Sequence, residues 1–177
     1  MQHTANDVVD YWRVAGPDEW FDQRPDFDDE LRRRFLATHE LASAERLAAW
    51  VHQPESALAL MILLDQFPRN AFRGTPRMYA TDELARHYAL QALQAGFDHR
   101  VESDMRLFFY LPFAHSERLE DQERSVVLHE RIGYLENARR HSDIIRRFGR
   151  FPHRNPILGR TTTPEEQAFL DAGGFAG

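Results

Sequence analysis

The sequence contains no cysteine and no lysine, and each absence excludes a kind of chemistry. Without cysteine the chain has neither a disulfide framework nor a thiolate nucleophile. All 22 basic residues are arginine, so a Schiff-base amine and the lysine of a phosphate-binding P-loop are also excluded. The side chains left for chemistry are those of Asp, Glu, His, Tyr, Ser and Thr, with Arg as a permanent cation.

Long apolar runs are also missing. The longest candidate, residues 57–64, ends at Asp65 and is far shorter than the roughly 18 apolar residues that a membrane span needs. The first residues lack the basic start and the apolar stretch of a secretory signal. We therefore expect a cytoplasmic protein without a membrane partner.

The charge of the chain is acidic overall but unevenly distributed. A formal net charge of −6 argues against a nucleic-acid partner. Residues 1–60 hold 12 acidic residues against 6 arginines, whereas residues 138–160 hold seven arginines against Asp143 alone. The arginine-rich stretch indicates either an internal network of ion pairs or a site for an anion.

Apolar residues recur with helical spacing, and no segment alternates as a strand would. The pattern predicts one all-α domain over residues 1–177. The segment 55–66 is apolar on nearly every side, so we expect it to be the central buried helix. Ser43 is expected to begin a helix, Thr81 to cap one that runs to Gly96, and Thr163 to start the last one with a capping box.

One short pattern occurs twice. Residues 67–70 read Phe-Pro-Arg-Asn and residues 151–155 read Phe-Pro-His-Arg-Asn. Each is followed by a neighbouring Gly and Arg and then by a helix start rich in Thr and Pro. Similar turns after two helices favour stacked antiparallel helical hairpins, although the 34-residue consensus of a tetratricopeptide array is not found.

Several longer motifs resemble a known bacterial family, the domain of unknown function 924 (DUF924). The resemblance rests on residues 63–70 (Leu-Leu-Asp-Gln-Phe-Pro-Arg-Asn), 72–77, 111–117 (Leu-Pro-Phe-Ala-His-Ser-Glu) and 147–160 (Arg-Phe-Gly-Arg-Phe-Pro-His-Arg-Asn-Pro-Ile-Leu-Gly-Arg). Tyr11-Trp12, Trp20-Phe21, Gln122 and His141 also fit it. The resemblance covers almost the whole chain and implies a tetratricopeptide-like stack of helices, but it implies no reaction.

Asp65 and His141 are the two residues whose surroundings are most unusual. Asp65 ends an apolar helix, where the helix dipole disfavours a carboxylate and burial demands a cation. One interpretation is an Asp65–Arg bridge that fixes the turn, and the other is a general base or the residue that orients a histidine. His141 is spaced to face inward, and its case for chemistry improves only if Asp65 or Glu117 lies within hydrogen-bond reach.

The candidate site combines residues of both repeated turns. Predicted ligand-binding residues are Arg69, Asn70, Arg73, Arg150, Arg154, Asn155 and Arg160, which could clamp a carboxylate or phosphate. Candidate catalytic residues are Asp65, His141 and His153, with Gln66, His115, Glu117 and Gln122 as further polar candidates. The alternative is that the arginines cap helix ends and pair with the protein's own carboxylates.

The sequence predicts no metal site, because no His or Glu pair has the spacing of metal ligands on a helix. It does not identify a cofactor. Two further functions stay open beside a pocket for a small anion, either catalytic or for binding alone. One is a tetratricopeptide-like groove that binds a peptide or a partner helix. The other is that both turns are buried polar networks that only fix the order of the helices.

Overall fold

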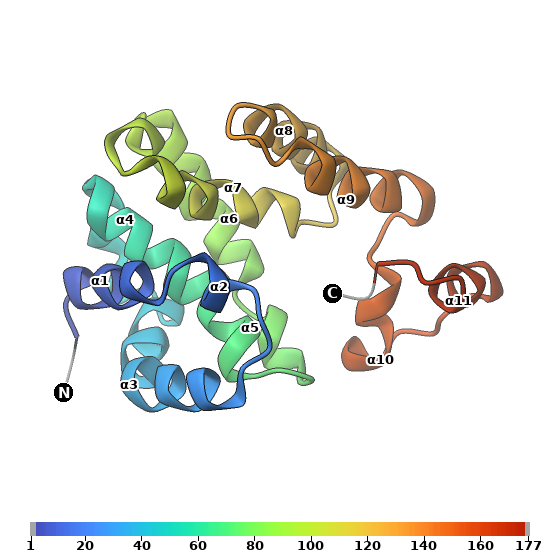
Figure 1. Ribbon diagram of the computed structural model, residues 1–177, viewed down its shortest axis with the longest axis horizontal. Helices are drawn as coiled ribbons and strands as arrows, with labels where there is room; N and C mark the ends of the chain where they lie inside the picture. Colours follow the sequence, from blue (N-terminus) through green and yellow to red (C-terminus); the bar gives the residue numbers. More distant parts are fainter. Residues whose placement is uncertain (1–2, 176–177) are drawn as a thin grey trace. The chain divides into compact units, whose positions relative to one another are not determined.

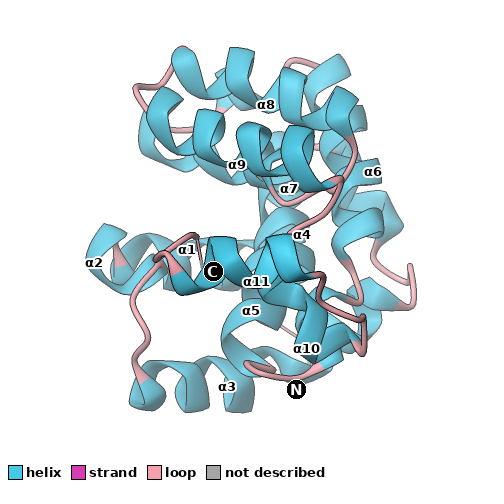
Figure 2. Cartoon of the chain, turned by 90° about the vertical axis from the view of Figure 1, so that its right-hand side faces the viewer, coloured by secondary structure: helices cyan, strands magenta, loops and turns pink. Residues whose placement is uncertain are grey.

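A computed structural model describes residues 3–175, and all regular secondary structure in that range is helical (Figure 1, Figure 2). The predicted all-α class is therefore confirmed. None of the helices in the described range is long and apolar enough to cross a membrane.

The chain forms two compact units. The N-terminal unit comprises Met1–Arg73 and Arg77–Pro112, and the C-terminal unit comprises Gly74–Pro76 and Phe113–Gly177. Helix α7 (Leu107–Ala114) runs across the boundary in the sequence. A single domain and a tetratricopeptide-like stacking of the helices stay predictions.

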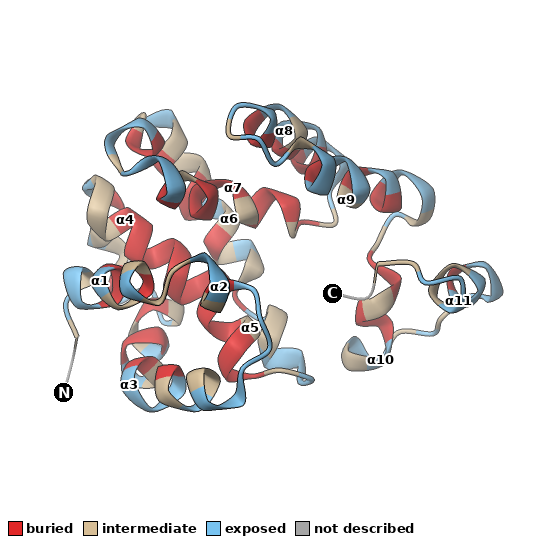
Figure 3. Ribbon diagram, in the orientation of Figure 1, coloured by how far each residue is buried: buried red, intermediate tan, exposed pale blue. Residues whose placement is uncertain are grey.

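The N-terminal unit is built around one helix, α4. Its helical segments are α1 (Ala5–Ala15), α2 (Pro17–Trp20), α3 (Pro25–Ser43), η1 (Ala48–His52), α4 (Pro54–Met61), η2 (Ile62–Gln66), α5 (Phe67–Ala71), η3 (Pro76–Tyr79), α6 (Asp82–Gln94), η4 (Phe97–Arg100) and η5 (Ser103–Arg106). Helices α1 and α6 pack against α4. Residues 57–61 of α4 have no exposed surface, as Figure 3 shows in red, so the predicted central buried helix is confirmed.

The C-terminal unit has a smaller core. Its helices are α8 (Leu119–Glu130), α9 (Leu135–Phe148), η6 (Pro152–Arg154), α10 (Asn155–Leu158) and α11 (Pro164–Asp171), and α8 packs along α9. Ile144, Ile145 and Phe151 form a buried cluster that Phe148, Phe169 and Phe175 partly cover. Gly149 ends α9 in a left-handed conformation (φ 69°), which a residue without a Cβ adopts at little cost.

The predicted helix starts have different outcomes. Thr163 caps α11 with a complete capping box, and Thr81 stands at the N-cap of α6. The prediction for Ser43 was wrong, because Ser43 ends α3 and its hydroxyl donates to the carbonyl of Glu40 at 3.1 Å. Glu45 then adopts a left-handed conformation (φ 59°), which stops the helix there.

Candidate functional site

The first repeated turn lies where Pro68 interrupts the helix that follows α4. The segment Ile62–Gln66 is a π-helix and α5 follows directly. Because proline has no N–H and the π-turn shifts the hydrogen-bond register, carbonyl groups in this stretch need donors from elsewhere. Side chains provide them: Thr81 Oγ1 donates to the carbonyl of Leu64 at 2.6 Å. The Thr81 hydroxyl is thus used on the preceding segment, and it makes no cap hydrogen bond to α6.

His39 supplies the second donor to this stretch. Its Nδ1 lies 2.9 Å from the carbonyl oxygen of Leu63, and since a carbonyl can only accept, Nδ1 carries the proton. The ring also stacks on Phe67, with 4.8 Å between centroids. Burial lowers the pKa of His39, so the imidazole is neutral near pH 7. His39 therefore acts as a structural histidine.

Asp65 is almost completely buried and lies beside a cation. Its Oδ1 is 3.3 Å from Nη1 of Arg69, and Gln66 Nε2 donates to Oδ2. Arg69 also donates to the Asp65 carbonyl at 2.6 Å and makes two bonds to Asp82 at 2.9 and 3.0 Å. Burial alone would lower the pKa of Arg69, but the carboxylates of Asp65 and Asp82 raise it. The Asp65–Arg bridge that the sequence suggests is present.

Asn70 and Arg73 share one carboxylate from α3. Asn70 Nδ2 donates to Asp28 Oδ1 at 2.7 Å, and Arg73 Nε donates to Oδ2 at 2.6 Å. Asp28 lies more than 40 residues earlier in the chain, so these bonds tie α5 to α3. In the N-terminal unit the polar side chains of the repeated turn thus make hydrogen bonds and ion pairs within the unit itself.

The second repeated turn contains a similar network. Arg160 donates to both oxygens of Glu117, at 2.7 and 3.0 Å, and its Nε donates to Asn155 Oδ1 at 2.9 Å. The backbone N–H of Phe151 also donates to Glu117, at 2.8 Å. Burial acts to raise the pKa of Glu117, but the bonds from Arg160 and Phe151 outweigh it and hold the pKa below its usual range.

Glu166 of α11 joins this network from the other side. Arg150 makes two bonds to its carboxylate, at 2.6 and 2.8 Å, and Asn155 Nδ2 and the Thr163 N–H also donate to it. The bonds from Arg150 dominate, and they lower the pKa of Glu166 to about 2. Glu166 thus binds Arg150, and Glu117 binds Arg160. These ion pairs count against the predicted clamp, in which both arginines would bind a ligand.

Arg154 is buried in a different setting. Its Nη2 donates to the carbonyl of His115 at 2.9 Å, and its guanidinium carbon lies 4.6 Å from the ring centre of Phe151. Gln122, also buried, donates to the carbonyls of Ala114 and Ser116 at 2.9 and 2.7 Å, so it caps the end of α7.

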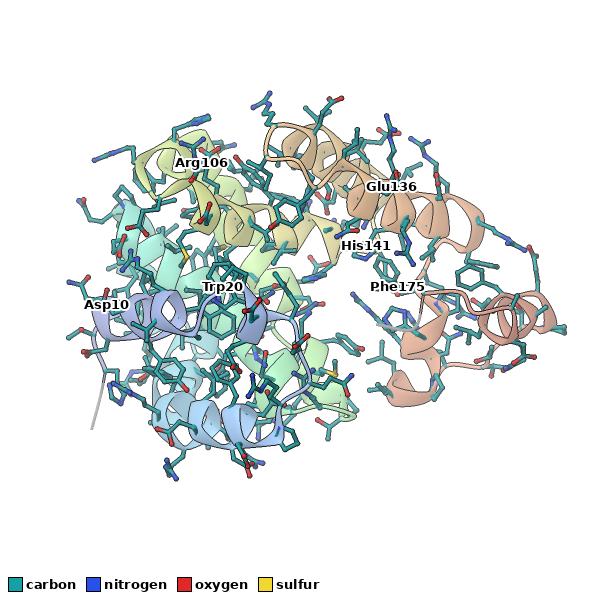
Figure 4. All side chains as sticks on the ribbon, viewed as in Figure 1. Asp10, Trp20, Arg106, Glu136, His141 and Phe175 are labelled. Atoms are coloured by element: carbon teal, nitrogen blue, oxygen red, sulfur yellow. The ribbon has the colours of Figure 1, made fainter. Side chains whose placement is uncertain are left out.

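Histidines gather around Phe151. The ring centres of His141 and His153 lie 5.5 and 5.6 Å from that of Phe151, and His115 lies 6.4 Å from His141. Phe175 touches both inner rings, at 4.7 Å from His141 and 5.2 Å from His153, and Figure 4 labels it beside His141.

The two inner histidines are neutral at pH 7 and each has an unused nitrogen. Burial is the largest cause in both: it lowers the pKa of His141 to about 3, with His115 adding to it, and that of His153 to about 4, with Arg154 adding to it. The Nδ1 atoms of both rings are buried and have no hydrogen-bond partner in the described part of the chain. Within residues 3–175, no three His, Asp or Glu side chains are placed to hold a metal ion.

Comparison with known proteins gives a family without an assigned activity. The model of bacterial proteins of unknown function DUF924 matches residues 8–174. The chain belongs to this family. A solved structure of the protein of unknown function ATU0120 from Agrobacterium tumefaciens is similar, with 53% identity, a TM-score of 0.93, and coverage of 96% of this chain and 97% of that one. No match is found among curated proteins.

Within this DUF924 chain, the structure brings part of the predicted site together. His115, His141, His153 and Arg154 gather around Phe151, and Arg160 donates to Glu117 and Asn155. Arg69, Asn70 and Arg73 belong to the N-terminal unit and bind its own carboxylates.

Sequence reasoning missed Phe175, His39, Asp28 and Asp82. Three of these act through contacts with residues distant in sequence, for which the chain gives no local signal. Phe175 does have a local signal in the sequence, because an aromatic side chain that follows two glycines at a helix end suggests that the chain folds back onto the core.

Proposed function

We propose that the C-terminal unit binds a small anionic molecule at an imidazole site formed by His115, His141, His153 and Arg154 around Phe151. The observation that carries the proposal is the pair of buried Nδ1 atoms, on His141 and His153, that lack hydrogen-bond partners in the described part of the chain. A buried polar atom without a partner costs about 1–3 kcal/mol, so two in one cluster need an explanation.

The N-terminal unit provides the contrast that favours a ligand. Its buried histidine, His39, uses Nδ1 to satisfy the carbonyl of Leu63. A histidine kept only for folding is expected to be satisfied in this way. His141 and His153 keep their Nδ1 atoms unused although both rings are packed against aromatic side chains.

The protonation of the rings indicates what the ligand offers. A neutral imidazole carries a donor on one ring nitrogen and an acceptor on the other, and the buried Nδ1 atoms of His141 and His153 are the positions without a partner in the described part of the chain. A hydroxyl or amine of a ligand can both donate and accept, so it suits either form of these rings. Since both inner rings are neutral, the positive charge comes from Arg154. A hydroxylated or aminated carboxylate or phosphate ester combines these features.

The same pKa values favour binding over proton transfer by His141. A group with a pKa of about 3 is a weak base at pH 7 and gives up a proton at once. Phe175 covers both rings, so a ligand reaches the Nδ1 atoms only when this side chain moves aside. We therefore expect slow binding that becomes faster in Phe175→Ala.

A thermal-shift screen tests the proposal. Wild type is tested against hydroxy acids, amino acids, sugar phosphates and inorganic phosphate, in parallel with His153→Phe, Arg154→Lys and the control His52→Asn, an exposed position. A ligand at 100 times its Kd adds about 2.7 kcal/mol, which is a shift of several degrees for a chain of this size. We expect a shift in wild type and His52→Asn that is lost in the two site variants.

Two outcomes would count against the imidazole site. One is the absence of any shift in wild type across all classes of compound. The other is a shift that survives in His153→Phe and Arg154→Lys. Either result would favour the alternative function, a tetratricopeptide-like module that binds a peptide or partner helix.

A further inference from the structure

A cavity lies in the C-terminal unit, on the hairpin of α8 and α9. Its volume is about 270 Å³, slightly below the range of drug-sized pockets, which begins at about 300 Å³. The lining residues are Glu123, Val126, Arg139, Ser142, Asp143 and Arg146. We call it the hairpin groove. It shares no residue with the imidazole site.

The groove follows from the spacing of residues on α9. Positions 139, 142, 143 and 146 are separated by three and four residues, so they lie along one face of the helix. Glu123 and Val126 of α8 are three residues apart and face them. Two positive side chains, two negative side chains and one aliphatic side chain thus line one small space.

The charged side chains of the groove do not form strong ion pairs with one another. Arg139 and Asp143 are one helical turn apart, yet no ion pair between them is found in the described part of the chain. Arg146 lies 3.7 Å from Glu123, a long contact between side chains that are 56% and 59% exposed. An exposed ion pair of this kind contributes little to stability, so a ligand can replace either partner.

Ser142 adds a polar atom without a partner. The residue is 2% exposed, lines the groove, and its Oγ makes no hydrogen bond within residues 3–175. A helical serine usually returns its hydroxyl to a carbonyl of the preceding turn. Here that hydroxyl stays available as a donor in a cavity that is also lined by two arginines.

We infer that the hairpin groove binds a zwitterion of the size of one aliphatic amino acid. The carboxylate lies between Arg139 and Arg146, where guanidinium groups can bind both its oxygens. The ammonium faces Asp143 and Glu123, and the aliphatic side chain rests on Val126. Both charges of the ligand are needed because both signs line the same space.

Backbone amide NMR of the full chain tests this with L-leucine, N-acetyl-L-leucine and L-leucinamide at millimolar concentration. We expect L-leucine to shift the amide signals of α8 and α9 around residues 123–126 and 139–146. Removing either charge of the probe should weaken binding by about tenfold, the effect of losing one hydrogen bond to a charged group. Arg139→Gln and Asp143→Asn should each weaken L-leucine binding to a similar extent.

Arg140→Gln is the matched control, because Arg140 is exposed on α9 and does not line the groove. It should bind L-leucine as wild type does. The inference is overturned if L-leucine shifts no signals of the groove, if the N-acetyl compound binds as well as L-leucine, or if Arg140→Gln weakens binding as much as Arg139→Gln. All three substituted residues are exposed, so the variants are expected to remain folded.

Discussion

The two repeated turns are built on the same anchor. In each, one buried Asn amide and one Arg share a carboxylate from elsewhere in the unit. Asn70 and Arg73 hold Asp28 in the N-terminal unit. Asn155 and Arg150 hold Glu166 in the C-terminal unit. The Asn of each repeated turn is therefore explained by folding, and it does not by itself mark a binding site. The Arg that shares the carboxylate follows the first turn but precedes the second.

The two repeated turns differ in how the buried nitrogens of their histidines are used. Near the first turn, Nδ1 of the buried His39 donates to the carbonyl of Leu63. That carbonyl lacks a backbone donor because Pro68 has no N–H. Around the second turn, His141 and His153 keep a buried nitrogen without a partner. A buried histidine nitrogen without a partner is therefore a better indication of a binding site than the motif with the most charges.

The largest expected difference between the units is their response to acid. His129, His141 and His153 of the C-terminal unit have folded pKa values of about 4, 3 and 4, against 6.5 in the unfolded chain. Because these pKa values are lowered, the unfolded state binds more protons, and stability is lost as pH falls from 6.5 towards 3–4. Each histidine contributes a slope of up to about 1.4 kcal/mol per pH unit.

Urea unfolding at pH 7, 6 and 5, followed by circular dichroism, measures this slope. His141→Phe should reduce it, whereas His99→Asn, at an exposed position of the N-terminal unit, should not. A stability that does not change between pH 7 and 5 would contradict the assignment.

All three tryptophans, Trp12, Trp20 and Trp50, lie in the N-terminal unit, so their fluorescence reports that unit alone. Coincident transitions by fluorescence and circular dichroism would support the predicted single domain.

The two anchoring carboxylates should differ in their contribution to stability. Glu166→Ala removes the bonds to Arg150 and Asn155 and half of the capping box of α11, and we expect a loss of about 3 kcal/mol. Asp28→Ala removes a more exposed pair and should cost about 2 kcal/mol. Chemical denaturation of both variants at pH 7 tests the order, and the reverse order would refute it.

Replacing histidine by phenylalanine in each unit separates folding from binding. His39→Phe keeps the stack on Phe67 but leaves the Leu63 carbonyl without its donor, so we expect a loss of about 2 kcal/mol. His153→Phe removes a nitrogen that has no partner and should change stability by less than about 1 kcal/mol while abolishing the ligand-induced thermal shift. Equal losses of stability in the two variants would mean that His153 is structural as well.

Thr81→Val should destabilise the chain less than His39→Phe. It is nearly isosteric and removes the hydroxyl that donates to the Leu64 carbonyl, so a loss of about 1 kcal/mol is expected from thermal or urea unfolding. Thr162→Val in the C-terminal unit, where the hydroxyl makes only a long 3.4 Å contact with Asn155, is the matched control and should be close to neutral. A neutral Thr81→Val would mean that the π-turn does not depend on this donor.

The sequence by itself determined the helical class, the buried helix that includes residues 57–61 and the cap at Thr163. Each of these depends on residues close together in the chain, such as a continuous apolar run or a Thr with Glu three positions later. The need of Asp65 for a cation was also predictable, because its partner Arg69 is one helical turn away.

Only the tertiary structure decided which polar residues are satisfied. Asp28 reaches Asn70 across 42 positions, Glu117 reaches Arg160 across 43, and His39 reaches Leu63 across 24. No local pattern reveals these partners, because a hydrogen bond depends on distance in space while periodicity reports only neighbours along the chain. For the same reason the sequence named His141 and His153 as candidates, but their buried Nδ1 atoms without a partner became visible only in the folded chain.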